Sequence, residues 1–167
     1  MSVSRCLIAN DSEFLLVVFQ ETLQKHFDVV DAVENGLQAV QAVQRQHPNY
    51  YSAIVLDISM PIMDGVEACL KIQDYFDKQD QQQLPAPDRI SSQFTFQRRR
   101  ASVMSVALQQ QAPYIYALTS ECEESVIRRI RRAGFKEVFH ALDQSVLKQI
   151  LSNAGLPYKL QRSANQK

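Results

Sequence analysis

Short apolar segments alternate with segments of helical spacing along most of this chain. The third apolar segment, 52–57, contains apolar residues almost throughout. A strand of this kind is typical of the centre of a parallel sheet that is covered on both faces. The pattern predicts strands over 4–9, 27–33, 52–57, 114–118 and 137–139, and helices over 13–25, 37–43, 65–72, 121–132 and from Asp143 to Leu151.

Five repeats of a strand followed by a helix predict an α/β fold with a doubly wound parallel sheet. We expect a flavodoxin-like, three-layer (βα)5 domain over residues 1–156, since 167 residues suffice for one domain and not for two. An irregular segment at about 77–111, rich in glutamine, proline and arginine, precedes the fourth strand. We expect it to be a flexible insert, and residues 157–167 to be a polar, frayed tail.

The composition excludes several classes of function. Acidic and basic side chains balance to a formal net charge of zero, which predicts no nucleic-acid partner and no attraction to anionic membranes. No segment approaches the roughly 20 apolar residues that a membrane helix needs. Cys6, Cys69 and Cys122 form neither a zinc motif nor a disulfide framework. We expect buried free thiols in a reducing compartment, and therefore a cytoplasmic protein.

Polar residues follow the predicted strands at the points where they end. Asn10 and Asp11 follow the first strand, Asp57 ends the third, Thr119 follows the fourth and His140 the fifth. The carboxyl ends of parallel strands open onto one edge of the sheet, where ligands bind. Two carboxylates there repel each other unless a cation lies between them, and magnesium accepts such oxygen ligands. Beside that metal, Asp57 is a nucleophile for a phosphoryl group.

The residues after Asp57 carry a specific motif. They run Ile-Ser-Met-Pro-Ile-Met-Asp-Gly to Gly65, which resembles the signature of two-component response-regulator receiver domains. The resemblance covers about residues 4–76 and 112–153. It implies that Asp57 is the phospho-acceptor and that Thr119 is the switch hydroxyl. It also implies a histidine kinase or phosphotransfer protein as the phosphoryl donor.

The metal site that follows has four members. We expect Mg to be held by Asp11, Asp57 and the backbone carbonyl of Ser59, with Asn10 as a weaker ligand, and we expect no other cofactor. Catalysis would be limited to phosphoryl acceptance and self-dephosphorylation at Asp57.

Two positions depart from the family pattern. Asn10 replaces a carboxylate, which removes one negative charge from the site. Ala141 stands where the family has a lysine after the fifth strand, while Lys136 lies at the start of that strand and should point elsewhere. His140 is adjacent, but neighbouring strand residues point to opposite faces of the sheet.

Two hypotheses of function therefore remain. One is a stand-alone receiver that is phosphorylated at Asp57 and signals through contacts with protein partners. The other is a pseudo-receiver that acts without phosphorylation, as an adaptor or as a structural component of a large cytoplasmic or cytoskeletal assembly. Neither hypothesis includes a nucleic-acid or membrane partner.

Two arginine-rich segments suggest further contacts. Arg98–Arg100 precede Ser102, which resembles a site for cyclic-nucleotide-dependent protein kinases, with a solvated basic loop as the alternative. The segment 128–132 contains four arginines on the predicted fourth helix. These arginines form either a solvated helix face or a docking surface for an acidic partner.

Overall fold

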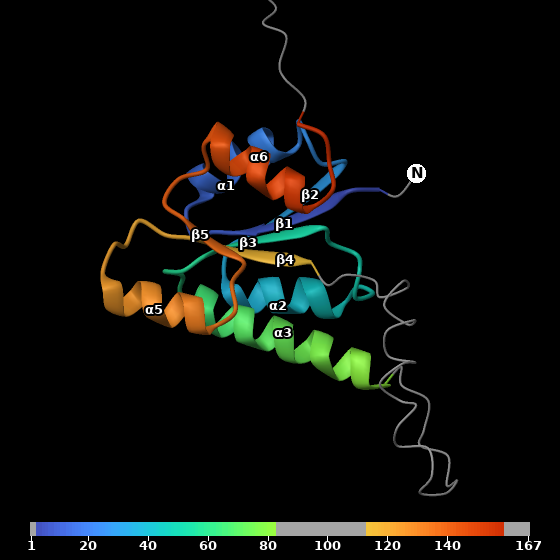
Figure 1. Cartoon of the computed structure of the whole chain (residues 1–167), viewed down its shortest axis with the longest axis vertical. Helices are drawn as coiled ribbons and strands as arrows, with labels where there is room; N and C mark the ends of the chain where they lie inside the picture. Colours follow the sequence, from blue (N-terminus) through green and yellow to red (C-terminus); the bar gives the residue numbers. More distant parts are fainter. Residues whose placement is uncertain (1–2, 83–112, 159–167) are drawn as a thin grey trace, which may run out of the picture.

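The computed structural model describes residues 3–82 and 113–158, and it has one parallel sheet with helices on both faces (Figure 1). Five strands run in the order β2-β1-β3-β4-β5. The elements are β1 Arg5–Ala9, α1 Glu13–Leu23, β2 Val29–Val33, α2 Gly36–Gln44, β3 Ala53–Asp57, α3 Gly65–Gln82, β4 Tyr114–Leu118, α5 Glu124–Arg132, β5 Glu137–Phe139 and α6 Gln144–Asn153. The predicted flavodoxin-like α/β fold is confirmed.

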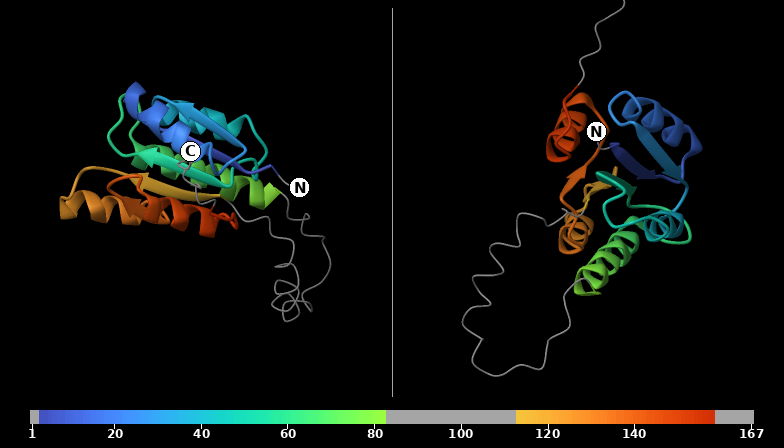
Figure 2. Two further views of the ribbon diagram at one scale, coloured as in Figure 1. Left: turned by 90° about the horizontal axis from the view of Figure 1, so that it is seen from above. Right: turned by 90° about the vertical axis from the view of Figure 1, so that its right-hand side faces the viewer.

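Two hydrophobic cores lie on opposite faces of the sheet. Helices α1 and α6 cover one face, and α2, α3 and α5 cover the other (Figure 2). Side chains of β3 alternate between the two cores: Ile54 and Leu56 belong to one, and Ala53 and Val55 to the other. This alternation explains why the third strand is apolar almost throughout, because neither of its faces meets solvent.

The third helix is longer than the sequence predicted. Helix α3 continues through Asp77 to Gln82, so the expectation that the chain becomes irregular at about Asp77 is wrong. The remainder of the expected insert, together with Ser102 and the tail from residue 159, lies outside the described residues. No helix in the described parts of the chain combines the length and the apolar character needed to cross a bilayer.

Helix α1 has apolar side chains on two faces. Phe14, Leu15, Val18 and Leu23 recur at helical spacing, which predicts an inward stripe, but Phe14 is 73% exposed and Val18 39%. Leu23 is buried as predicted, and the other buried position of the helix is Leu16. Apolar residues at most positions satisfy helical spacing in more than one phase, so the spacing predicts the helix but not the buried face.

The cysteines are all free, as expected, but they differ in exposure. Cys6 and Cys69 are buried in the cores. Cys122 is exposed in the connection before α5, so the expectation of three buried thiols is wrong for that residue. The fourth helix was expected from residue 121 and begins at Glu124 instead. Residues 121–123 form the connection that leads from the end of β4 into α5.

Candidate functional site

The strand register brings three sequence-predicted residues together at one edge of the sheet. Ala9 pairs with Leu56, and Asp57 pairs with Leu118. The next residues along β1 and β4, Asn10 and Thr119, therefore lie on either side of Asp57. Asn10 is 2% exposed and Thr119 is 4% exposed, whereas Asp57 is only partly buried. Asp57 is thus the reachable group of a buried polar trio.

Both carboxylate oxygens of Asp57 accept hydrogen bonds from the protein. The side-chain amide of Asn10 donates to Oδ2 at 2.7 Å, and the backbone N–H of Ser59 donates to Oδ1 at 3.2 Å. The amide oxygen of Asn10 accepts from the backbone N–H of Ser12 at 2.8 Å. These contacts fix the orientation of the amide, because the reverse orientation would place two oxygens against each other. Asn10 therefore presents a donor to Asp57 and directs its oxygen to Ser12 rather than toward a metal.

The surroundings of Asp57 disfavour its negative charge. Burial raises the pKa of the Asp57 carboxyl above its usual range, and the negative charges of Asp11 and Glu121 raise it further. The hydrogen bond from the Ser59 backbone acts in the opposite direction and lowers that pKa. A cation placed between Asp57 and Asp11 would relieve the repulsion between the two carboxylates.

The oxygen donors at this edge are compatible with a magnesium ion that has fewer protein ligands than the sequence predicted. In the described residues, no three or more histidine, cysteine, aspartate or glutamate side chains are arranged to hold a metal. Magnesium, however, is commonly bound through one or two carboxylates and keeps several of its waters. Asp11, Asp57 and the Ser59 carbonyl are the oxygen donors that we expect to form such a set. Asn10 is not an oxygen ligand in the observed orientation.

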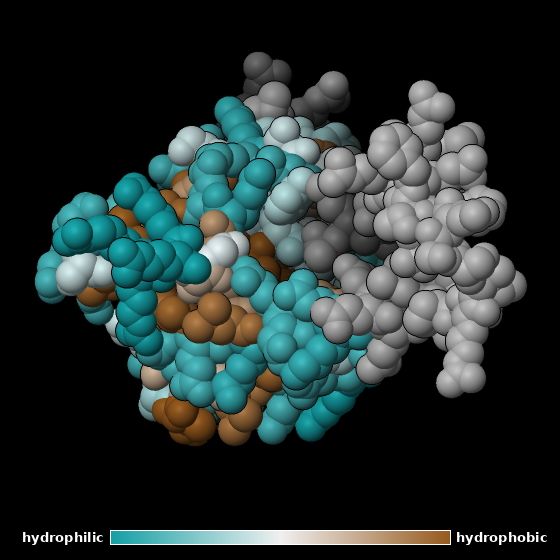
Figure 3. Space-filling model, turned by 60° about the horizontal axis from the view of Figure 1, so that its bottom comes forward, coloured by the Kyte–Doolittle hydropathy of each residue, from teal (hydrophilic) through white to brown (hydrophobic). Residues whose placement is uncertain are grey.

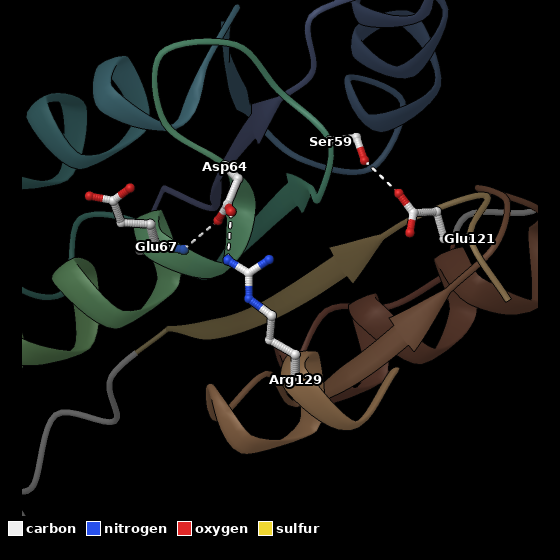
Figure 4. Close-up of polar contacts among 5 residues, drawn as sticks. All are labelled: Ser59, Asp64, Glu67, Glu121 and Arg129. Atoms are coloured by element: carbon white, nitrogen blue, oxygen red, sulfur yellow. Dashed lines mark hydrogen bonds and ion pairs between the residues drawn. The ribbon is translucent and has the colours of Figure 1, made fainter. Parts of the chain in front are cut away.

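A pocket of about 420 Å³ opens beside this edge. Its polar lining residues are Asp11, Ser59, Asp64, Glu121 and Arg129. The Ser59 hydroxyl donates to Glu121 Oε1 at 3.0 Å, and the Arg129 guanidinium pairs with Asp64 Oδ2 at 2.6 Å (Figure 4). The Ser59–Glu121 contact joins the loop after β3 to the connection before α5, and the Asp64–Arg129 pair joins the same loop to α5 itself.

Asp64 has two functions in this loop. It accepts a hydrogen bond from the backbone N–H of Glu67 at 2.7 Å, in the first turn of α3. Burial alone would raise the pKa of Asp64, but the Glu67 N–H and the Arg129 guanidinium together hold that pKa below its usual range. Asp64 is therefore a persistent anion that holds Arg129 at the rim of the pocket.

Gly65 is required by the close approach of two backbone segments. Its N–H donates to the carbonyl of Ile58 at 3.0 Å. A Cβ atom at this position would lie 2.1 Å from the carbonyl oxygen of Asp57, far inside van der Waals contact. The glycine of the Met-Asp-Gly motif thus lets the start of α3 pack directly against the backbone of Asp57.

The end of β5 places no cation over Asp57. Ala141 is exposed. The Lys136 ammonium lies 4.9 Å from the ring centre of Tyr114. The backbone N–H of Lys136 donates to the carbonyl of Ile115, near the start of β4 and therefore far from Asp57. His140 Nδ1 lies 2.9 Å from the carbonyl oxygen of Thr119. Among the residues that line the pocket, Arg129 is the one with a positive side chain.

Sequence reasoning missed Glu121 and Arg129 as members of the site. Arg129 was grouped with the basic face of its helix, and Glu121 was taken as the start of that helix. Their partners lie 62 residues away for Glu121 and 65 for Arg129. No local motif signals a pair over that separation. The position of Glu121, three residues after the end of β4, was the only available hint.

Comparisons with known proteins agree with the class of protein that this fold and polar edge define, a doubly wound α/β domain with an aspartate at the end of its third strand. The family model for the response regulator receiver domain matches residues 6–82. The chemotaxis protein CheY of Halobacterium salinarum is 36% identical over 69 residues, 41% of this chain and 55% of that protein. CheY of Bacillus subtilis is 29% identical over 125 residues, 74% of this chain and 84% of that protein.

Solved structures share the fold at low sequence identity. CheY in a complex with CheX, BeF3 and magnesium from Borrelia burgdorferi has a TM-score of 0.58 at 23% identity, with 89% of this chain and 87% of that chain covered. The receiver domain of a sensor histidine kinase from Pseudomonas aeruginosa, with magnesium in its active-site cleft, has a TM-score of 0.60 at 18% identity, covering 92% and 99%.

The chain contains a response regulator receiver domain of the kind used in two-component signalling. It spans about half the length of the halobacterial CheY, and its match covers only 5% of a histidine kinase from Schizosaccharomyces pombe. The receiver fold therefore occurs both in small proteins and as a part of much larger ones.

Proposed function

We propose that this chain accepts a phosphoryl group on Asp57 and passes the signal to other proteins through direct contacts. The observation that carries the proposal is the position of Asp57. Its carboxylate ends β3 beside the buried hydroxyl residue Thr119, in surroundings that raise its pKa. A carboxylate whose charge is disfavoured, next to a second carboxylate, is poised for a reaction that recruits a cation.

The chemical step is a phosphoryl transfer. An oxygen of Asp57 attacks the phosphorus of a phosphohistidine on a histidine kinase or phosphotransfer protein. The new O–P bond gives an acyl phosphate, the P–N bond breaks, and its electron pair returns to the imidazole, which takes up a proton. Magnesium, when bound by Asp11, Asp57 and the Ser59 carbonyl, supplies neutralisation of the phosphoryl charge. The Asn10 amide holds Oδ2, so Oδ1, with its longer bond to Ser59, is the freer nucleophile.

The route from the acceptor to the surface begins at Thr119. The backbone N–H of Glu121 donates to the Thr119 hydroxyl oxygen at 3.1 Å. Movement of that hydroxyl toward a phosphoryl group would therefore displace Glu121 and break its contact with Ser59. The connection 121–123 leads directly into α5, so a local change of charge reaches a surface helix within a few residues.

A second candidate function is a pseudo-receiver that binds partners without phosphorylation. Two observations favour it: Asn10 occupies one oxygen of Asp57 at 2.7 Å, and Ala141 provides no cation over the site. Such a protein would be an adaptor or a structural component of a cytoplasmic assembly. Both candidates place the output in protein contacts, in the cytoplasm, and neither involves nucleic acid.

Incubation with acetyl phosphate, a small phosphoryl donor, separates the two candidates. We expect the intact mass of the chain to increase by one phosphoryl group in the presence of magnesium, with the added group sensitive to hydroxylamine as an acyl phosphate is. Asp57→Ala should show no such change. A wild-type mass that stays constant with both acetyl phosphate and a cognate phosphohistidine donor would favour the pseudo-receiver.

A further inference from the structure

A groove of about 650 Å³ lies between α3 and α5, on the face of the molecule that Figure 3 shows. Its apolar lining is Val66, Leu70 and Ala133, and Leu70 is 50% exposed. Figure 3 shows apolar surface on this face between hydrophilic side chains. The polar lining comprises Glu67, Ser125, Arg128, Arg129 and Arg132. The groove therefore combines an apolar floor with a largely basic rim.

Ion pairs neutralise the positive charge of the rim only in part, and Glu67 adds one negative charge to the rim. Arg128 lies 3.8 Å from Glu124, in a pair whose side chains are both more than half exposed. Arg129 is paired with Asp64. Arg132 has no ion-pair partner in the part of the chain that the structure describes. Because the whole chain has a formal net charge of zero, this local excess reflects separated charge, and it favours a negatively charged occupant.

The chain's own segments outside the described residues do not have that charge. Residues 83–112 contain Asp88 as their only acidic side chain, against Arg89 and Arg98–Arg100. Residues 159–167 contain basic side chains and no acidic ones. Either segment would bring further positive charge to the arginines of α5. The electrostatic complement of the groove therefore comes from another molecule.

We propose that the groove between α3 and α5 binds an acidic amphipathic helix of a partner protein. A helix that lies between two helices presents one apolar row to Val66 and Leu70, and aspartate or glutamate side chains on its flanks meet the arginines. The proposal deepens the proposed function by naming its output surface. It rests on output through protein contacts, but not on phosphorylation of Asp57.

A second copy of the chain is the rival occupant. The outward face of α1 is apolar at Phe14 and Val17 and carries Glu13 and Glu21, so it has the same chemistry as the proposed partner. Docking of α1 into the groove of another copy, however, would be a head-to-tail contact between unlike surfaces. Such contacts continue into open filaments unless their rotation happens to close a ring. A separate partner satisfies the groove without that consequence.

Arg129 connects the groove to the acceptor site, because it lines both pockets. A carboxylate of the partner that binds Arg129 competes with Asp64 for the same guanidinium. Occupation of the groove should therefore disturb Asp64 and the loop that follows β3.

The test uses two synthetic helical peptides of about 20 residues, long enough to form a helix, each with the same row of leucines. One peptide has glutamate at its flanking positions, and the other has lysine. Binding is measured by fluorescence anisotropy of the labelled peptide, with the full chain at roughly 0.1 M salt. We expect saturable binding of the glutamate peptide and at least tenfold weaker binding of the lysine peptide.

Matched variants locate the binding site. Arg132→Glu and Leu70→Asp should each weaken the glutamate peptide at least tenfold. Arg131→Glu makes the same charge change outside the groove and is the control for Arg132→Glu. Val17→Asp alters a half-exposed apolar residue on α1 and is the control for Leu70→Asp. Both controls should bind the glutamate peptide normally. Asp57→Ala should also bind normally, which keeps this test separate from that of phosphorylation.

Three results would overturn the proposal. These are equal binding of the two peptides, no binding of the glutamate peptide at millimolar concentration, or equal loss of binding in Arg131→Glu and Arg132→Glu. Concentration-dependent self-association that both Arg132→Glu and Val17→Asp abolish would assign the groove to a second copy instead.

Discussion

The side-chain amide of Asn10 donates a 2.7 Å hydrogen bond to Oδ2 of Asp57, at a position where the receiver family has a second carboxylate. The substitution exchanges a repulsive pair for an attractive one. This contact stabilises Asp57 in the unmodified protein without a metal, and we expect it to reduce the affinity of the site for a metal. This relationship determines how the site should respond to mutation, to pH and to magnesium.

Asn10→Asp should reverse that exchange. A buried carboxylate at position 10 would face Asp57 without a donor between them, so we expect a loss of about 1–3 kcal/mol of unfolding free energy without metal. Magnesium should restore part of this stability, and it should raise Tm more in the variant than in the wild type. Thermal unfolding with and without magnesium measures both effects. The double variant with Asp57→Asn is the control, and an equal response of all three proteins to magnesium would contradict the prediction.

The raised pKa of Asp57 predicts a pH dependence of stability. A carboxyl whose pKa is higher in the folded state than in the unfolded state favours folding in its protonated form. Its contribution is therefore fully present below the unfolded pKa of roughly 4 and is lost as the pH rises through the folded value. Asp57→Asn should be less pH-dependent than the wild type in that window, so that its relative stability increases from pH 4 to pH 7.

Chemical denaturation at several pH values measures this difference. Glu21→Gln, which removes a carboxylate from the exposed surface of α1, is the control and should change the pH profile little. A difference between Asp57→Asn and wild type that is constant across this pH range would be inconsistent with the raised pKa.

Arg129 should matter more for anion binding than for stability. Its ion pair with Asp64 is more than half exposed on the arginine side, and exposed pairs contribute about 0–1 kcal/mol. Arg129→Gln should therefore change the unfolding free energy by less than about 1 kcal/mol. It should weaken the binding of beryllofluoride with magnesium several-fold, because it removes the cation that lines the pocket. Calorimetric titration measures the affinity, with Arg131→Gln as the control; equal affinities in the two variants would exclude this role.

Gly65→Ala should be strongly destabilising. The added methyl would lie 2.1 Å from the Asp57 carbonyl oxygen, and relief would require movement of β3 or of the start of α3. We expect a loss of about 3 kcal/mol or more, at the upper end for overpacking. Gly155→Ala is a matched control, because its φ is +68° but no atom lies within 4 Å of the added Cβ. That control should lose about 1–2 kcal/mol from its left-handed φ alone, and denaturant unfolding compares the two.

The sequence predicted the sheet well because the pattern of each strand is a direct consequence of burial. β4 and β5 have the predicted bounds, and Asp143 caps α6 as expected, with Oδ1 accepting from Ser145 and Val146. The carboxyl-edge residues also followed from topology, since strand order alone places Asn10, Asp57 and Thr119 together. These features depend on local pattern and on a small number of rules for connecting strands and helices.

Contacts between distant loops could not be predicted in the same way. The Asp64–Arg129 and Ser59–Glu121 pairs depend on how α5 is placed against α3, which no local pattern specifies. The face of α1 that packs inward was also ambiguous, because Phe14 and Leu16 are both apolar. The orientation of the Asn10 amide required the position of the Ser12 N–H, which only the folded backbone provides.

If Asp57 is a working acceptor, its modification should reach α5 through Thr119. Amide NMR of the full chain with magnesium and beryllofluoride, a mimic of the phosphoryl group, would detect this coupling, with Asp57→Ala as the control. We expect shifts at Asp57, Thr119 and Glu121 that continue through residues 124–132 and are absent in the control. Spectra that do not change at millimolar magnesium, or that change equally in Asp57→Ala, would exclude phosphorylation-dependent signalling and favour the pseudo-receiver.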